Sequence, residues 1–193
     1  MLAIIPARGG SRRIPGKNKK YFHGKPIIAY SIMAAQDSGL FDRVVVTTDD
    51  PEIYVIAEAY GAVCIGRPSE LCQDDVGTQD VAKWVLSNYP FYEYACVIYP
   101  CAPMIDISRL GDGLLAIKNG TLPYAYSTDE NLFDAGQWYW GRVSAFMEGV
   151  PLGESFKLYV PNAIDINTPE DWKKAEEMYG RINGNKGNEV VYG

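Results

Sequence analysis

The sequence predicts an α/β fold, in which a mostly parallel central sheet is covered on both faces by helices. Two apolar runs rich in β-branched residues, 2–5 and 43–48, have the composition of buried strands. Each run is followed by a loop and then by a segment of helical pattern, 26–38 and 51–60. Strands and helices that alternate in this way form parallel sheets, which bind ligands at the carboxyl ends of the strands.

Turn and capping residues set the boundaries of the first elements. The first helix is predicted to begin at Pro26, which suits an initial helical position, and to end before Gly39. In the second helix, Asp50 is the expected N-cap and Pro51 the first helical residue. A short strand is expected to follow at residues 62–65.

The remaining elements continue the same alternation. From Thr78 to about Tyr89 a helix is expected, followed by strand 95–99, helix 107–119 and strand 121–128. Trp138 and Trp140 flank Tyr139, as residues on one face of a strand do, so these tryptophans are predicted core residues.

The last predicted helix begins at a capping box. Thr168 is the expected N-cap, Pro169 the first helical residue and Asp171 the acidic partner of the cap. The glycine- and asparagine-rich segment from Gly180 is predicted to be flexible. We therefore expect one domain over residues 1–179 and a tail over residues 180–193.

The loop after the first strand has the composition of a polyphosphate-binding site. It contains Gly9, Gly10 and Ser11, and no acidic residue appears in the chain before Asp37. Its basic residues are Arg8, Arg12, Arg13, Lys17, Lys19, Lys20 and Lys25. Free N–H groups, close backbone approach and cations together suit phosphate oxygens.

Two common phosphate-binding motifs are absent from this loop. Gly10 and Gly16 are separated by five residues, and Lys17 precedes Asn18, so the spacing does not match a Walker loop. The dinucleotide pattern G-x-G-x-x-G is also missing. The loop therefore matches neither of these two phosphate-binding motifs. A basic, glycine-rich turn exposed to solvent is the alternative interpretation.

Composition narrows the class of ligand. The 193 residues carry a net charge of −6, so binding to nucleic acid is not favoured. Because the cations are concentrated in one loop, the expected ligand is a small anion.

The sequence also bears on the location of the protein and on metal binding. No apolar run is long enough to span a membrane and no signal peptide precedes Met1, so a cytoplasmic protein is expected. The four cysteines form no C-x-x-C pair and there is one histidine, which argues against a zinc site.

Residues 4–18, Ile-Ile-Pro-Ala-Arg-Gly-Gly-Ser-Arg-Arg-Ile-Pro-Gly-Lys-Asn, closely resemble the signature of the CMP-sialic acid synthetase family. Within that family the chain is most similar to the pseudaminic acid branch. The family usually has Lys at the position of Arg12, which keeps the charge. The resemblance implies a Rossmann-like three-layer sandwich of the nucleotide-diphospho-sugar transferase type. It also implies transfer of CMP from CTP to an acidic nine-carbon sugar, with release of pyrophosphate.

The resemblance assigns the nucleotide site residue by residue. Arg8, Arg12 and Lys17 would neutralise the triphosphate and its leaving group. Arg67 would contact the cytosine carbonyl and Thr78 the edge of the base. The first-loop residues expected to contact the nucleotide are Ala7, Arg8, Gly9, Gly10, Ser11, Arg12, Lys17 and Asn18. From the residues alone, a surface ion pair would explain Arg67 equally well.

On the acceptor side, the resemblance points to Tyr99 and to residues 134–137, Asp-Ala-Gly-Gln. Tyr99 replaces a glutamine of sialic acid synthetases, and a Tyr-x-x-Ala-Pro arrangement is favoured in the pseudaminic branch. Asp134 and Gln137 offer an acceptor and an amide to sugar hydroxyl or acetamido groups. The sequence identifies no general base.

The family motif Asp-Ile-Asp, whose carboxylates hold Mg²⁺, reads Asp165-Ile166-Asn167 here. Asp165 and Asn167 are therefore the expected metal ligands, and the amide should weaken metal binding because it carries no negative charge. Helix capping alone would also explain this segment.

Two departures affect the acceptor half. Some tens of residues that the family usually carries between Tyr126 and Asp134 are reduced to a short segment, in a region that often contributes to dimer packing. Basic residues that commonly precede the metal motif, and that could bind the sugar carboxylate, are replaced by residues 159–164, Tyr-Val-Pro-Asn-Ala-Ile. A homodimer remains open, as do two alternatives: a catalytically weak nucleotide-binding module, or another sugar nucleotidyltransferase of the same fold.

Overall fold

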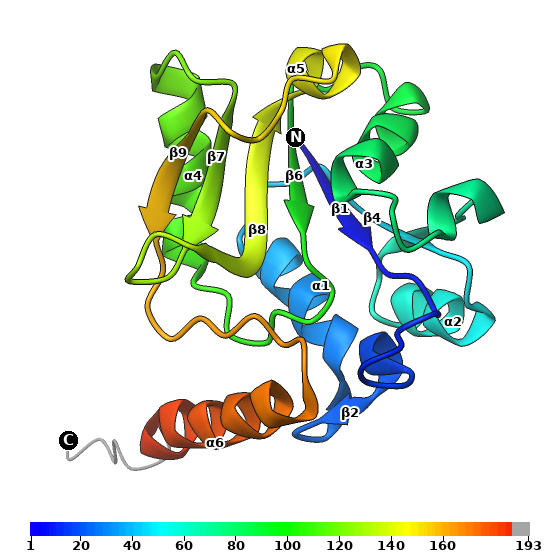
Figure 1. The fold of residues 1–193 in the computed structure, drawn as a ribbon, viewed down its shortest axis with the longest axis vertical. Coiled ribbons are helices and arrows are strands. Elements are labelled where there is room, and N and C mark those ends of the chain that lie inside the picture. The colour runs from blue at the N-terminus through cyan, green and yellow to red at the C-terminus, as the bar shows by residue number, and fades with distance from the viewer. Residues whose placement is uncertain (187–193) are drawn as a thin grey trace.

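The computed structural model describes residues 1–186 and is built on a seven-stranded sheet (Figure 1). Strand β8 alone runs antiparallel to its neighbours, so the sheet is mostly parallel, as predicted. In spatial order the strands are β5 (Val63–Gly66), β4 (Arg43–Thr48), β1 (Leu2–Pro6), β6 (Tyr94–Ile98), β8 (Asp134–Arg142), β7 (Tyr124–Thr128) and β9 (Ser155–Tyr159).

Helices cover both faces of this sheet and form a three-layer sandwich (Figure 1). One face packs against α1 (Ile27–Asp37), α2 (Pro51–Ala59) and α4 (Ile107–Asn119). The opposite face packs against α3 (Thr78–Ser87) and α5 (Val143–Glu148). Successive strand side chains point to opposite faces, so Ile5 of β1 joins the first core and Ile4 joins the second.

Most predicted elements are found within a few residues of their expected bounds. Helix α4 has the predicted ends, and Asp50 accepts hydrogen bonds from two backbone N–H groups at the start of α2. Pro26 lies just before α1 rather than inside it, because it pairs in a small hairpin of β2 (Tyr21–Phe22) and β3 (Lys25–Pro26). Trp138 and Trp140 are fully buried, which confirms the core assignment. No helix within residues 1–186 is long and apolar enough to cross a bilayer.

The C-terminal helix α6 (Pro169–Lys186) corrects one prediction. Residues 180–186, which we expected to be part of a flexible tail, continue this helix, and residues 187–193 lie outside the described part. The predicted capping box is present, since Thr168 and Asp171 exchange hydrogen bonds. Tyr179 packs on Phe22 with ring centroids 5.3 Å apart, and such tertiary contacts outweigh the poor helix propensity of the following glycines.

Candidate nucleotide-binding site

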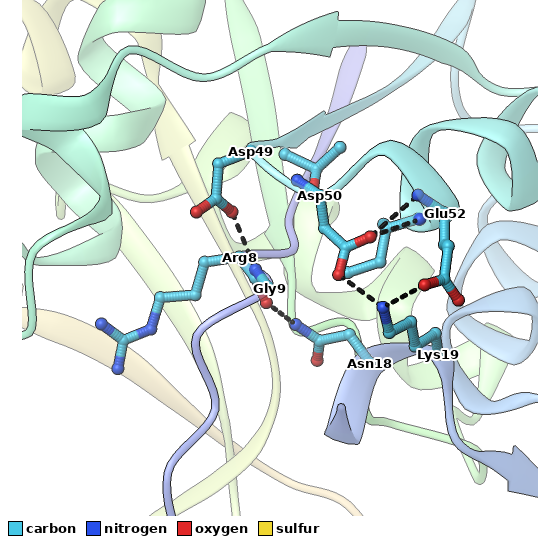
Figure 2. Close-up of polar contacts among 9 residues, drawn as sticks. Arg8, Gly9, Asn18, Lys19, Asp49, Asp50 and Glu52 are labelled. Atoms are coloured by element: carbon cyan, nitrogen blue, oxygen red, sulfur yellow. Dashed lines mark hydrogen bonds and ion pairs between the residues drawn. The ribbon is translucent and has the colours of Figure 1, made fainter. Parts of the chain in front are cut away.

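The first loop leaves the carboxyl end of β1 and is held by two hydrogen bonds to the β4 end of the sheet and by one bond within the loop. Ala7 is fully buried, and its N–H donates to the Thr47 carbonyl at 2.9 Å. The Gly9 N–H donates to Asp49 Oδ1 at 2.8 Å, and Asn18 Nδ2 donates to the Arg8 carbonyl at 2.8 Å (Figure 2). The loop is thus closed on itself, and the Arg8 side chain points away from Asn18 (Figure 2).

A second set of contacts joins the loop to the start of α2. Lys19 Nζ lies 2.8 Å from Asp50 Oδ2 and 3.0 Å from Glu52 Oε1 (Figure 2). Burial tends to raise the pKa of Asp50, but the hydrogen bonds from Lys19 and the helix N–H groups outweigh it and lower that pKa. A Cβ on Gly9 would lie 2.9 Å from the Asp50 Cβ, so only glycine permits this close approach.

A cavity of about 480 Å³ opens at the carboxyl edge of the sheet, between the first loop and the segment before α6. Basic side chains of the loop line one wall: Arg8, Arg12, Arg13 and Lys17. The facing wall contains Tyr99, Cys101, Gly136, Asp165, Ile166 and Asn167. Positive charge on one side and a carboxylate on the other suit a phosphorylated ligand.

The cations of the cavity have different partners. Arg8 and Arg12 both contact Asp74, at 2.7 and 2.6 Å, and this carboxylate holds them side by side. Lys17 Nζ donates to the Ile166 carbonyl at 2.7 Å, and Arg13 donates to Asn167 Oδ1 at 2.8 Å. The loop therefore reaches across the cavity to the Asp165–Asn167 segment.

Asp165 is positioned by a glycine with a left-handed backbone. Gly136 has φ +63°, and a Cβ there would lie 2.6 Å from the Asp165 Cγ. Asn167 Nδ2 donates a hydrogen bond to Asp165, so the amide is shared between that carboxylate and Arg13. Asn167 consequently does not present its amide oxygen alongside the Asp165 carboxylate.

The acceptor-side residues lie beside this wall. Tyr99 donates from its hydroxyl to Asp134 Oδ2 at 3.3 Å. Surrounding protein atoms that displace water, and then the charge of Asp165, raise the pKa of Asp134. Gln137 is buried and donates to the Met104 carbonyl at 3.2 Å, while its Oε1 has no hydrogen-bond partner within residues 1–186.

Arg67 and Thr78 lie outside the lining of the cavity. Arg67 is buried, which lowers its pKa, and it donates to the Thr47 carbonyl at 2.9 Å. It lines a neighbouring hollow together with Asp49 and Cys72. Thr78 accepts a hydrogen bond from the Tyr139 hydroxyl at 2.9 Å.

The cavity thus brings together only part of the predicted set. The predicted residues that line it are Arg8, Ser11, Arg12, Lys17, Asn18, Tyr99, Asp165 and Asn167. Gly10 lies in the same loop, with no atom within 4 Å of a Cβ built on it. Sequence reasoning missed Arg13, Asp74, Cys101 and Gly136 as lining residues. The basic run contained the signal for Arg13, whereas nothing in the sequence marked the pairing of Asp74 with two arginines.

Comparison with known proteins gives consistent results. Residues 2–139 match the family model described as cytidylyltransferase. A pseudaminic acid cytidylyltransferase from Campylobacter jejuni is 42% identical, over 92% of this chain and 95% of its own. That alignment spans 221 positions, more than the 193 residues of this chain, so the relative holds residues that this chain lacks.

Two further relatives match part of the sequence or the fold. CMP-N,N'-diacetyllegionaminic acid synthase from Legionella pneumophila is 50% identical over 53% of this chain and 47% of its own. A solved CMP:2-keto-3-deoxy-manno-octonic acid synthetase in complex with CTP has a TM-score of 0.76 at 17% identity. It covers 94% of this chain and 98% of its own, which shows that the two share a fold.

Proposed function

The chain belongs to the cytidylyltransferase family, and from this premise we propose that it transfers CMP from CTP to a nonulosonic acid, with pseudaminic acid as the expected acceptor. The anomeric hydroxyl of the sugar attacks the α-phosphorus in line, a P–O bond to the sugar forms, and the bond to pyrophosphate breaks. The hydroxyl proton leaves to solvent or to a phosphate oxygen.

One observation carries this proposal: the first-loop cations and Asp165 line the same cavity. The reaction needs close positioning of two anionic substrates and stabilisation of charge on the leaving pyrophosphate. Arg8, Arg12 and Lys17 are the proposed partners of the triphosphate. The backbone of Gly10, with the Ser11 hydroxyl, would approach the same phosphates, whereas the Gly9 N–H is held by Asp49 and would hold the loop in place.

The remaining predicted residues are proposed to contact either the cytosine base or the acceptor sugar. Arg67 lies in the adjoining hollow and would contact the cytosine. Thr78, which lines neither that hollow nor the cavity, is proposed for the edge of the base from the family resemblance alone. Tyr99 lines the opposite wall and would contact the acceptor sugar. Asp134, which accepts the Tyr99 hydroxyl, and Gln137, which follows the lining residue Gly136, are proposed for the same sugar.

A divalent cation fits the wall at Asp165. Mg²⁺ is typically held by one or two carboxylates together with substrate phosphates and water, so a single protein carboxylate is sufficient. Within residues 1–186 no group of three His, Cys, Asp or Glu side chains could hold a metal alone. We propose that Asp165 holds Mg²⁺, which would supply charge neutralisation to the phosphates. Asn167 is a weaker candidate ligand, because Arg13 occupies its oxygen.

The test is pyrophosphate release from CTP and Mg²⁺, measured with pseudaminic acid, legionaminic acid, sialic acid and no acceptor, and repeated with UTP and GTP. Release that depends on pseudaminic acid and CTP is expected. Lys17→Ala should lower kcat/KM by at least about tenfold, the loss of a charged hydrogen bond. Lys83→Ala, at an exposed position of α3, is the matched control and should match the unmodified chain. CTP binding without release would favour the non-catalytic module.

A further inference from the structure

Arg13 is the cation of the cavity that the proposed nucleotide contacts leave unused. Within residues 1–186, Arg8 and Arg12 pair with Asp74, and Lys19 pairs with Asp50 and Glu52. Arg13 and Lys17 instead contact neutral groups, the Asn167 amide and the Ile166 carbonyl. Within this part of the chain, Arg13 therefore makes no ion pair with a carboxylate.

We propose that Arg13 binds the carboxylate of the acceptor sugar and that Asn167 positions it for this task. The inference rests on the proposed function and adds a residue that determines the acceptor class. Its first support is the chemistry of a nonulosonic acid, in which one carbon bears both the carboxylate and the anomeric hydroxyl. A group that binds this carboxylate must lie next to the reacting hydroxyl. Arg13 is held by Asn167, whose amide also bonds to Asp165, the proposed metal ligand.

The second support is the amide at position 167. Asn167 accepts from Arg13 through its oxygen and donates to Asp165 through its nitrogen. If the amide were turned over, its NH₂ group would face the N–H groups of Arg13 and its oxygen would face the Asp165 carboxylate. Both contacts would be repulsive, so the two charged neighbours fix the orientation of the amide. An aspartate at position 167 would form an ion pair with Arg13 and neutralise its positive charge. The neutral amide holds the guanidinium by a hydrogen bond and does not neutralise that charge.

The third support is the geometry of the two unpaired cations. A planar guanidinium matches a carboxylate with two parallel hydrogen bonds, whereas a lysine ammonium acts as a compact point charge. Arg13 therefore suits the carboxylate and Lys17 suits the phosphates. Residues 159–164, which directly precede Asp165, contain no basic side chain that could take the same role.

The experiment compares pseudaminic acid with its C1 carboxamide, which keeps the shape of the acceptor and removes its charge. The unmodified chain should prefer the acid. In Arg13→Gln the acceptor KM should rise about 10- to 100-fold, as expected for a charged hydrogen bond, and the preference for the acid should disappear. CTP affinity measured by calorimetry should stay within about twofold, which also shows that the variant is folded. Asn167→Asp should reduce the same preference.

Arg12→Gln is the matched control, because it removes the same charge from the adjacent position. It should weaken CTP binding and keep the preference for the acid. If Arg13→Gln raises the KM of CTP alone, or keeps the preference for the acid, the role of Arg13 is overturned and the proposed function stands. If the unmodified chain turns over no nonulosonic acid, the proposed function fails, and the assignment of Arg13 fails with it.

Discussion

The two walls of the cavity are built in different ways. The first loop is a continuous segment that carries its cations within a few residues of one another. It is held by a bond within the loop and by contacts to the end of β4 and the N-cap of α2. The facing wall combines Gly136 of β8 with Asp165, which comes from a distant part of the chain. A continuous phosphate loop can be recognised from sequence, whereas the facing wall depends on the close packing of separate segments.

The largest effect is expected from Gly136→Ala, which tests whether the facing wall depends on the close packing of Gly136 against Asp165. The new Cβ would lie 2.6 Å from the Asp165 Cγ, and the backbone φ of +63° disfavours any residue with a side chain. We expect kcat/KM to fall on the order of 100-fold, because Asp165 must move, and the free energy of unfolding to fall by about 1–3 kcal/mol. Steady-state kinetics and urea denaturation measure the two effects.

Gly153→Ala is the control for this substitution. No atom lies within 4 Å of a Cβ at that position and its φ is not positive, so activity and stability should match the unmodified chain. If Gly136→Ala retained full kcat/KM, Asp165 would not need its present position, and the facing wall would tolerate displacement as a surface loop does.

Much of the architecture could be predicted because local signals agreed with one another. Asp50 followed by Pro51 marked the start of α2, and alternation placed both tryptophans of β8 in the core. The site was less predictable because its contacts join residues far apart in sequence. The link between Arg13 and Asn167 spans 154 positions, and no pattern in either segment encodes it. Helix α6 extended past Gly180 for a similar reason, since its packing against the hairpin of Phe22 is tertiary.

A smaller effect is expected from loosening the first loop at Asp50. Asp50→Ala removes the N-cap of α2 and the contact with Lys19, and should lower the free energy of unfolding by about 1–2 kcal/mol. The native pKa of Asp50 is lowered, so its contribution is present above the unfolded value near 3.9 and is lost as pH falls through the native pKa. The deficit of the variant should therefore shrink in acid.

Asp106→Ala provides the comparison for Asp50, because Asp106 caps α4 in the same way without touching the first loop. Both variants should lose similar stability, measured by urea denaturation at pH 7. Only Asp50→Ala should weaken CTP binding in calorimetry. Equal CTP affinity in the two variants would show that the Lys19 contact does not position the loop.

The smallest effect is expected at Asp134, on the acceptor side. Its pKa is raised by displaced water and by Asp165, so the folded state disfavours its charged form. Asp134→Asn removes that cost and should raise the free energy of unfolding at pH 7. The gain should be less than about 1 kcal/mol, because water still reaches much of this side chain and screens its charge. The gain should vanish below the unfolded pKa near 3.9, where both states are protonated. Asp112→Asn, in a surface ion pair, should show no such gain. A gain for Asp134→Asn that persisted unchanged in acid would rule out the carboxylate charge as its cause. The facing wall would then lack the repulsion between Asp134 and Asp165 that distinguishes it from the first loop, where Asp74 and Asp50 lie beside cations.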